Sequence, residues 1–185
     1  MKFIFRKTRL PGVLLVKPEW RPDGRGAAAE IYRASELRKA GIRDVFVQEN
    51  RSVSRRGVVR GFHYQRPPAA QARLVRCGKG RAYCAVVDLR RGSRTYGRAF
   101  GAELSDANWL ALYAPEGFAY GFCALTDGAE VVYKCSREFS PAHYAGLRWD
   151  DPALKLRWPV RGPKVAARDA ALPLLAELED GGGKR

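Results

Sequence analysis

The stretch Gly57-Val58-Val59-Arg60-Gly61-Phe62-His63-Tyr64-Gln65 contains one of the two histidines of the 185-residue chain. Its β-branched and aromatic residues predict a strand over Val58–Tyr64. Strict alternation along this strand would place Arg60 and His63 on opposite faces. A guanidinium suited to anions and an imidazole that titrates near neutral pH would then share one strand. Such a histidine is either a satisfied structural residue or a proton-transfer group, and the rest of the sequence bears on that choice.

Short strand-like segments recur on both sides of this stretch, separated by Gly, Pro, Asp and Asn. The pattern predicts an all-β fold, an antiparallel jelly roll or sandwich with short peripheral helices. The other expected strands are Val13–Val16, Ala28–Tyr32, Asp44–Glu49, Ala72–Cys77, Arg81–Asp88, Ala99–Leu104, Trp109–Ala114, Ala119–Ala124 and Glu130–Cys135. The connection Gly78-Lys79-Gly80 is short enough to close a hairpin.

Two helices are expected at the periphery of this fold. One is Ser35–Ala40, with its serine as N-cap and Gly41 just beyond its end, and the other is the Ala- and Leu-rich segment Pro163–Leu178. The chain length fits a single domain over residues 1–178. Residues 179–185, with three consecutive glycines, are expected to form a disordered tail.

The composition is that of a soluble globular protein, with 46% hydrophobic and 29% charged residues. We find no run of the ~20 apolar residues that a membrane helix needs, and the N-terminal residues do not resemble a secretory signal. The cysteines Cys77, Cys84, Cys123 and Cys135 show no CxxC spacing and lie in apolar segments. We therefore expect free thiols in a reducing cytoplasm, with disulfides as the alternative.

The net charge of +15 and the pI near 10.1 admit three explanations. A basic surface attracts nucleic acid, and it equally attracts a small phosphorylated substrate. The third explanation is an arginine-rich composition without functional meaning. No basic helix, zinc-finger spacing or RNA-binding signature is present, so we do not expect a nucleic-acid partner.

The candidate chemistry is narrowed by the motifs that are missing. A metal site needs about three protein ligands, but His63 has no His-x-His partner and His143 lies far along the chain. No Gly-x-Ser-x-Gly elbow and no Gly-rich phosphate loop occur. Metal-free acid–base chemistry at His63, with a phosphate-binding arginine nearby, remains.

Six segments in register give the sequence a specific resemblance. They are Asp23-Gly24-Arg25-Gly26, Phe46-Val47-Gln48-Glu49-Asn50, the Gly57–Gln65 stretch, Val87-Asp88-Leu89-Arg90, Val132-Tyr133-Lys134-Cys135 and Gly146-Leu147-Arg148-Trp149-Asp150-Asp151-Pro152. With these segments the chain resembles the dTDP-4-dehydrorhamnose 3,5-epimerases, which are jelly-roll proteins of the cupin class. The resemblance runs from Leu10 to Asp169 and implies a cytosolic enzyme without a cofactor.

The resemblance implies proton transfer on a nucleotide-linked 4-keto-6-deoxy sugar. A base removes a proton from a carbon beside the ketone, and an acid reprotonates the resulting enolate from the opposite face. By resemblance His63 is the base, Tyr133 is the acid, and Asp169 orients the histidine. A core tyrosine at 133 and a helix-start aspartate at 169 are the alternatives.

The resemblance also implies a set of substrate-binding residues and a homodimer. Arginines are expected on the pyrophosphate, polar side chains on the rest of the substrate, and one acid on the nucleotide. These residues are Arg25, Arg60 and Arg168 for the pyrophosphate, Gln48 and Asn50 for the substrate, and Glu30 for the nucleotide. In the family an N-terminal strand crosses to the partner subunit, so Arg25 and Glu30 are expected to serve the neighbouring site.

The chain departs from the family pattern around the ligand. Arg73 replaces a lysine near the ketone, Tyr120 replaces a histidine, and Tyr144 replaces a glutamate. Ala27–Ala29 replace aromatic residues that would stack on the nucleotide. All three substituted side chains remain candidates for substrate binding. The departures leave open a 3- or 5-monoepimerase, a different nucleotide or sugar, and a non-catalytic sugar-nucleotide binding module.

Overall fold

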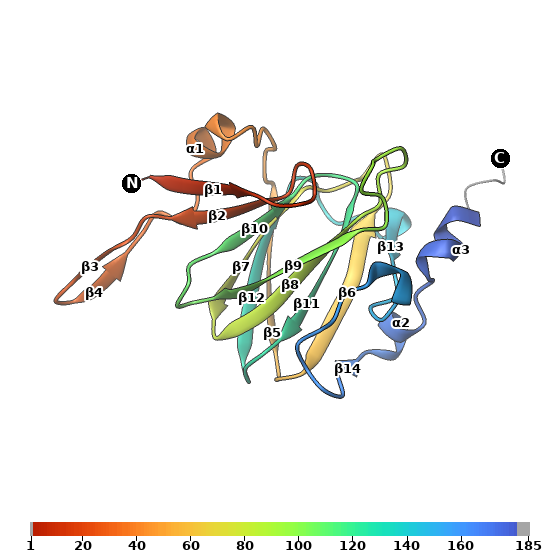
Figure 1. The fold of residues 1–185 in the computed structure, drawn as a ribbon. Helices are drawn as coiled ribbons and strands as arrows, with labels where there is room; N and C mark the ends of the chain where they lie inside the picture. Colours follow the sequence, from red (N-terminus) through yellow and green to blue (C-terminus); the bar gives the residue numbers. More distant parts are fainter. Residues whose placement is uncertain (1, 181–185) are drawn as a thin grey trace.

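The computed structural model describes residues 2–180, which form two facing β-sheets with short helices at their edges (Figure 1). The strands of the first sheet are β1 Phe3–Lys7, β2 Leu14–Pro18, β5 Gln48–Ser54, β7 Arg73–Lys79, β10 Ala111–Ala114 and β12 Ala129–Cys135. Those of the second are β6 Val58–Gln65, β8 Arg81–Asp88, β9 Ala99–Ser105, β11 Phe118–Ala124 and β13 Tyr144–Gly146. Their orders are β1-β2-β10-β7-β12-β5 and β13-β6-β11-β8-β9, and all these neighbours pair antiparallel. The predicted antiparallel jelly roll is confirmed.

The main core fills the space between the sheets. Val75 and Leu112 from the first sheet meet Cys84, Val86 and other residues of the second, and all are buried. The alternate residues of β8 face the other way, against the C-terminal part of the chain, so β8 is buried on both faces. This layering explains why apolar runs without alternation occur in an antiparallel fold.

Several elements differ from those expected. Gly78–Gly80 does not close a hairpin, because it joins β7 in the first sheet to β8 in the second. The expected strand Ala28–Tyr32 is replaced by a hairpin of β3 Arg21–Asp23 and β4 Gly26–Ala28. The strand expected at Asp44–Glu49 begins later, as β5. Strands β1 and β13 were not expected from the sequence.

The helices are shorter than the sequence pattern indicates. Helix α1 spans Ala34–Lys39, and its N-cap is Arg33, without a side-chain cap, rather than the expected serine. The segment Pro163–Leu178 is not one helix but contains β14 Lys164–Val165, which pairs parallel with β6, then α2 Ala167–Ala170 and α3 Leu175–Asp180. Pro173 separates the two helices, because proline lacks the N–H that a continuous helix would use.

Helix α3 extends to Asp180 and so includes the first two residues of the expected tail; residues 181–185 lie outside the described part. The short 3₁₀ turns η1 Pro141–His143 and η2 Pro152–Leu154 complete the described elements. No helix within residues 2–180 has the length and apolar character to cross a membrane.

Strand β6 departs from strict alternation at Gly61. Tyr120 pairs with His63, whereas Phe122 pairs with Arg60, so β6 carries one extra residue as a β-bulge. Gly61 has φ of +113°, and a Cβ there would lie 2.7 Å from the backbone of the adjacent strand, so only glycine fits. Cross-strand partners share a face. The bulge therefore places Arg60 and His63 on the same face, and the expectation of opposite faces is wrong.

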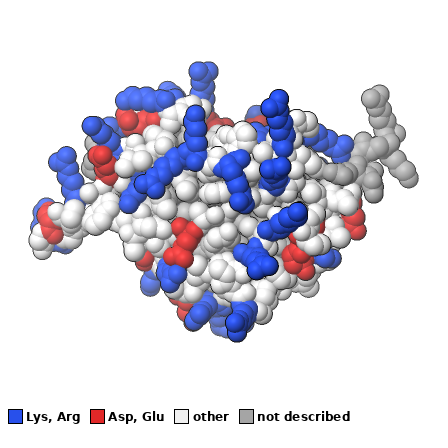
Figure 2. Space-filling model, viewed as in Figure 1, with Lys and Arg blue, Asp and Glu red and all other residues white. Residues whose placement is uncertain are grey.

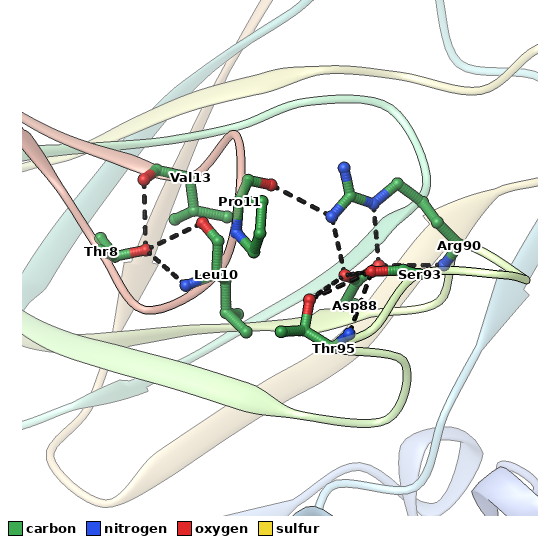
Figure 3. A network of polar contacts seen from close by, with 8 residues as sticks. All are labelled: Thr8, Leu10, Pro11, Val13, Asp88, Arg90, Ser93 and Thr95. Atoms are coloured by element: carbon green, nitrogen blue, oxygen red, sulfur yellow. Dashed lines mark hydrogen bonds and ion pairs between the residues drawn. The ribbon is translucent and has the colours of Figure 1, made fainter.

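A polar network around Asp88 connects two loops of the fold (Figure 3). The fully buried Asp88 accepts hydrogen bonds from the Arg90 guanidinium (2.7 and 2.9 Å) and from the hydroxyls of Ser93 and Thr95 (both 2.7 Å). Arg90 also donates to the carbonyl of Pro11 (3.1 Å). The network thereby ties the β1–β2 turn to the β8–β9 loop.

Candidate active site

A cavity of about 330 Å³ opens between the two sheets near the free edge of β5. Its lining combines one histidine, two tyrosines, two arginines and several amides. The lining residues are Gln48, Asn50, His63, Gln71, Arg73, Tyr133, Cys135, Phe139, Tyr144 and Arg168. A larger hollow of about 640 Å³ lies elsewhere, but no histidine lines it. The smaller cavity is therefore the one in which a histidine is available for proton transfer.

His63 and Asp169 form a pair at the wall of this cavity. Nε2 of His63 lies 2.9 Å from Oδ1 of Asp169, whose other oxygen accepts the Gly61 backbone N–H at 3.1 Å. Asp169, in α2, is 3% exposed. Because a carboxylate can only accept, Nε2 carries the imidazole proton and Nδ1 carries the lone pair. The pair therefore holds the imidazole in the tautomer that can accept a proton at Nδ1.

The surroundings of His63 favour its neutral form. Burial lowers the pKa of His63, the Asp169 carboxylate partly offsets this, and the charges of Arg73 and Arg168 lower it further. The net shift is downward from the ordinary value of ~6.5. His63 is thus unprotonated at neutral pH, as a general base must be.

Tyr133 lies on β12, in the sheet that faces His63. Burial raises the pKa of the Tyr133 hydroxyl, and the nearby charge of Arg73 only partly counters that shift. The hydroxyl therefore keeps its proton at neutral pH and can donate it. A protonated tyrosine and an unprotonated histidine in one cavity have the complementary states that acid–base catalysis requires.

Hydrogen bonds hold the polar rim of the cavity. Gln48 donates to the Asn50 side chain (3.0 Å) and accepts the backbone N–H of Phe139 (2.7 Å). The ring of Tyr144 lies 5.4 Å from the ring of His63 and 5.4 Å from the guanidinium carbon of Arg168. The mouth of the cavity is thus both aromatic and cationic.

Most, but not all, of the residues expected at the site meet there. Arg60 is outside the lining and donates to Ser54 Oγ at 3.1 Å. Arg25 lies in the β3–β4 hairpin, which projects from the body of the subunit (Figure 1). It pairs with Asp23 of the same hairpin. Glu30 pairs with Arg33 and also lies outside the lining. Within one described subunit, the N-terminal residues do not reach the cavity.

Tyr120 lies beneath the cavity rather than in its lining. It is 5% exposed, and its hydroxyl lies 3.7 Å from the Cys84 thiol in the core. Its ring centroid lies 6.0 Å from that of Tyr133.

Sequence reasoning missed three residues of the lining. Gln71 bonds to Arg73 (3.1 Å) and to the Arg137 carbonyl (2.7 Å), Cys135 ends β12, and Phe139 is 53% exposed at the mouth. The position of Gln71, two residues before Arg73 and just ahead of β7, could have indicated it. Phe139 lies in an irregular loop whose fold against Gln48 carries no local signal.

No group of three or more His, Cys, Asp and Glu side chains that could hold a metal ion occurs among residues 2–180. The four cysteines are free and buried.

Comparison with known proteins agrees with this geometry. Residues 7–177 match the family model described as dTDP-4-dehydrorhamnose 3,5-epimerase. A Shigella flexneri protein of that name is 42% identical over 164 residues, which cover 88% of this chain and 91% of the relative. The chain belongs to the dTDP-4-dehydrorhamnose 3,5-epimerase family. The family and the enzyme class predicted from the sequence, an epimerase, are confirmed.

Solved structures of related proteins share the whole fold. NovW, a 4-keto-6-deoxy sugar epimerase from Streptomyces spheroides, has a TM-score of 0.94 at 39% identity, covering 98% of this chain and 92% of NovW. ChmJ, a 3′-monoepimerase from Streptomyces bikiniensis solved with dTDP-quinovose, has a TM-score of 0.89 at 34% identity, covering 95% and 89%. The family thus contains relatives that differ in the number of carbons they epimerise.

Proposed function

We propose that this epimerase acts on a dTDP-linked 4-keto-6-deoxyhexose, with His63 as base and Tyr133 as acid. The observation that carries the proposal is the His63–Asp169 pair, whose free Nδ1 shares a cavity with the Tyr133 hydroxyl. The family membership and the dTDP-sugar in the ChmJ structure support the choice of substrate.

The reaction follows from the protonation states. Nδ1 of His63 takes the proton from the carbon beside the ketone, and the electrons of that C–H bond move to the ketone oxygen to give an enolate. The guanidinium of Arg73, which lines the cavity beside both groups, stabilises the enolate charge. Tyr133 then donates its proton to the opposite face of the same carbon. Solvent returns a proton to Tyr133 and removes one from His63.

The remaining arginines suit the pyrophosphate. Arg168 is 72% exposed at the mouth and points its guanidinium over Tyr144, so it is accessible to an incoming anion. Figure 2 shows Lys and Arg spread across one face with Asp and Glu between them, rather than gathered into a stripe. This spread fits general attraction of a small anion better than a track for nucleic acid. Four free cysteines fit a cytoplasmic enzyme.

Assembly as a homodimer would complete the nucleotide end of the site. The β3–β4 hairpin is exposed along its whole length and projects from the body of the subunit (Figure 1), and none of its residues lines the cavity. In a dimer that exchanges these hairpins, Arg25 of one subunit would reach the neighbouring cavity.

Hybrid dimers test that exchange. A mixed dimer of a His63→Ala chain and an Arg25→Ala chain contains one intact site only if the hairpin serves the neighbour. We expect activity to return in the hybrid when both parent homodimers are inactive. If each hairpin serves its own site, the hybrid stays inactive.

A monoepimerase is the second candidate. Ala27–Ala29, at the end of the hairpin, and Tyr144 at the mouth alter the surface around the ligand, while the His63–Asp169 pair is kept. ChmJ shows that this fold supports epimerisation at one carbon.

Proton exchange separates these possibilities. The protein is incubated with dTDP-4-keto-6-deoxyglucose in deuterated water, and NMR follows each ring carbon. We expect deuterium to enter at C3 and C5 for a 3,5-epimerase and at one of them for a monoepimerase. Binding without exchange at either carbon would identify a non-catalytic binding module.

A further inference from the structure

The guanidinium of Arg73 lies between two tyrosine rings. Its central carbon is 5.7 Å from the ring centroid of Tyr120 and 5.7 Å from that of Tyr133. Both distances fall within the ~6 Å over which a cation is attracted to the face of an aromatic ring. The Tyr133 ring carries the proposed acid, whereas Tyr120 takes part in no step of the proposed reaction.

The sheet register explains how the two elements meet. Tyr120 on β11 is the direct cross-strand partner of His63 on β6, so the two share the inner face of the second sheet. Arg73 opens β7 in the opposite sheet, where it pairs with Cys135 and Ala114. The Arg73 side chain therefore crosses the cavity and comes to rest on a ring that stands beside the base.

Arg73 has few other anchors. It donates to Oε1 of Gln71 at 3.1 Å and to the His63 carbonyl at 3.5 Å, and it contacts the Cys135 thiol. No ion pair among residues 2–180 involves Arg73. A long, rotamer-rich side chain without a carboxylate partner depends on its remaining contacts for a fixed position.

Tyr120 contributes its ring rather than its hydroxyl. The hydroxyl lies against the Cys84 thiol in the core, 3.7 Å away, and burial raises its pKa well above the ordinary value. Because this hydroxyl faces the core and Tyr120 lies outside the cavity lining, Tyr120 is unsuited to be an alternative acid. Its ring face is what remains available to Arg73.

We propose that Tyr120 is a positioning residue whose ring holds the Arg73 guanidinium beside the reacting ketone. The inference rests on the proposed function, because it assigns Arg73 to the enolate. Tyr120→Leu should lower kcat about tenfold and leave KM nearly unchanged, since the pyrophosphate contacts lie elsewhere. Tyr120→Phe, which keeps the ring, should retain the parent kcat.

The pH profile provides a reading that a simple packing defect would not change. His63 faces Asp169, Arg73 and Arg168, and the charge of Arg73 helps to lower its pKa. If Arg73 leaves in Tyr120→Leu, the pKa of His63 rises, and the acidic limb of kcat/KM moves to higher pH. Phe122→Leu is the matched control. Phe122 is a buried ring on the same strand, and among the described ring contacts it packs on Tyr120 and not on the Arg73 guanidinium.

The deciding experiment observes Arg73 directly, without activity. In ¹⁵N-labelled protein, the Arg73 side-chain N–H resonance should show an upfield ring-current shift in the parent, in Tyr120→Phe and in Phe122→Leu. In Tyr120→Leu the shift should shrink, and the NOE contacts between the Arg73 side chain and the Tyr133 ring should weaken because the guanidinium leaves its place. Unchanged NOE contacts with Tyr133 in folded Tyr120→Leu would overturn the proposal even if the enzyme epimerises its substrate. Absence of epimerisation with a normal resonance response would instead count against the proposed function.

A second variant covers the case in which Tyr120→Leu does not fold. A ring-fluorinated phenylalanine at position 120 keeps the shape of Tyr120→Phe but weakens the negative ring face. We expect kcat to fall with increasing fluorination; a kcat independent of fluorination would contradict the proposal.

Discussion

Two buried aspartates, Asp88 and Asp169, lie in different parts of the fold, and their surroundings differ in kind. Asp88 takes hydrogen bonds from Arg90, Ser93 and Thr95. Asp169 takes one from a backbone N–H, and its other oxygen faces His63 at 2.9 Å and the exposed Arg168 at 3.6 Å. Burial alone would raise the pKa of Asp88, but the donors around it outweigh burial and lower it to about 2.

The comparison shows how one residue type serves structure in one place and chemistry in another. All donors to Asp88 lie in the β8–β9 region, and its network connects two loops of the scaffold (Figure 3). The partner of Asp169 is a titratable ring that also lines a cavity. A carboxylate that is fully hydrogen-bonded by the scaffold stabilises the fold. A carboxylate bonded to a histidine instead determines which ring nitrogen carries the lone pair and where that lone pair points.

Removing the partner of each aspartate should separate these roles most strongly. His63→Ala should reduce epimerisation by ~10²–10⁴-fold or more, because a general base typically contributes that factor. The second histidine cannot replace it, since His143 bonds to Ser140 at 2.8 Å and lies outside the cavity lining. Initial rates measured by NMR, with circular dichroism to establish folding, check this outcome.

Arg90→Ala is the matched variant at the other aspartate. It should lower the free energy of unfolding by about 3 kcal/mol, because it leaves a buried carboxylate short of its charged partner. The rate per folded molecule should stay at the parent level.

For the first of these two variants, a folded His63→Ala enzyme with near-normal turnover would remove His63 from the mechanism.

Tyr133→Phe should sharpen the comparison by separating deprotonation from reprotonation. His63 is untouched, so solvent exchange can continue, while correctly inverted product should fall by ~10²–10⁴-fold. Product stereochemistry and deuterium content, measured on the same samples, check this. Inverted product at close to the parent rate would make Tyr133 a core tyrosine.

The pH profile tests the smaller effect of the Asp169 carboxylate on its partner. The pKa of His63 is lowered by burial, so kcat/KM should rise with pH and level off from a midpoint below ~6.5. Asp169 raises the pKa of His63 against this trend, and Asp169→Asn should therefore move the midpoint to still lower pH. A midpoint that moves upward in this variant would contradict the assigned pairing.

The smallest expected effect is that of a chelator. Neither aspartate belongs to a group of metal ligands among residues 2–180. Dialysis against a strong chelator should leave the rate unchanged, as measured by the same NMR assay. Restoration of a lost rate by zinc, iron or manganese would refute this prediction.

The sequence was sufficient for most of the scaffold because β-branched runs and turn residues are local signals. Strand β8 was predicted with its observed ends, and the His63–Asp169 contact followed from the family resemblance. Local alternation failed at Gly61, because a bulge is fixed by the register of the neighbouring strand. The placement of Gly78–Gly80 failed for a similar reason, since a short connection does not reveal whether its strands share a sheet.

The residues around the ligand depended on contacts between distant segments. Tyr120 was expected to contact substrate, but pairing with β6 and a hydroxyl turned toward Cys84 place it beneath the cavity. Phe139 reaches the mouth because its backbone bonds to Gln48, 91 residues earlier in the chain. No local pattern encodes either arrangement.

Substituting the two aspartates in parallel tests the central claim most directly. Asp169→Asn and Asp88→Asn are compared for deuterium entry into the sugar per folded molecule and for the free energy of unfolding. We predict that Asp169→Asn loses exchange by at least about tenfold, since a wrongly held imidazole cannot present its lone pair, and unfolds less readily than Asp88→Asn. We predict that Asp88→Asn loses stability but exchanges at the parent rate. Parent-level exchange in Asp169→Asn, or its loss in folded Asp88→Asn, would contradict the account.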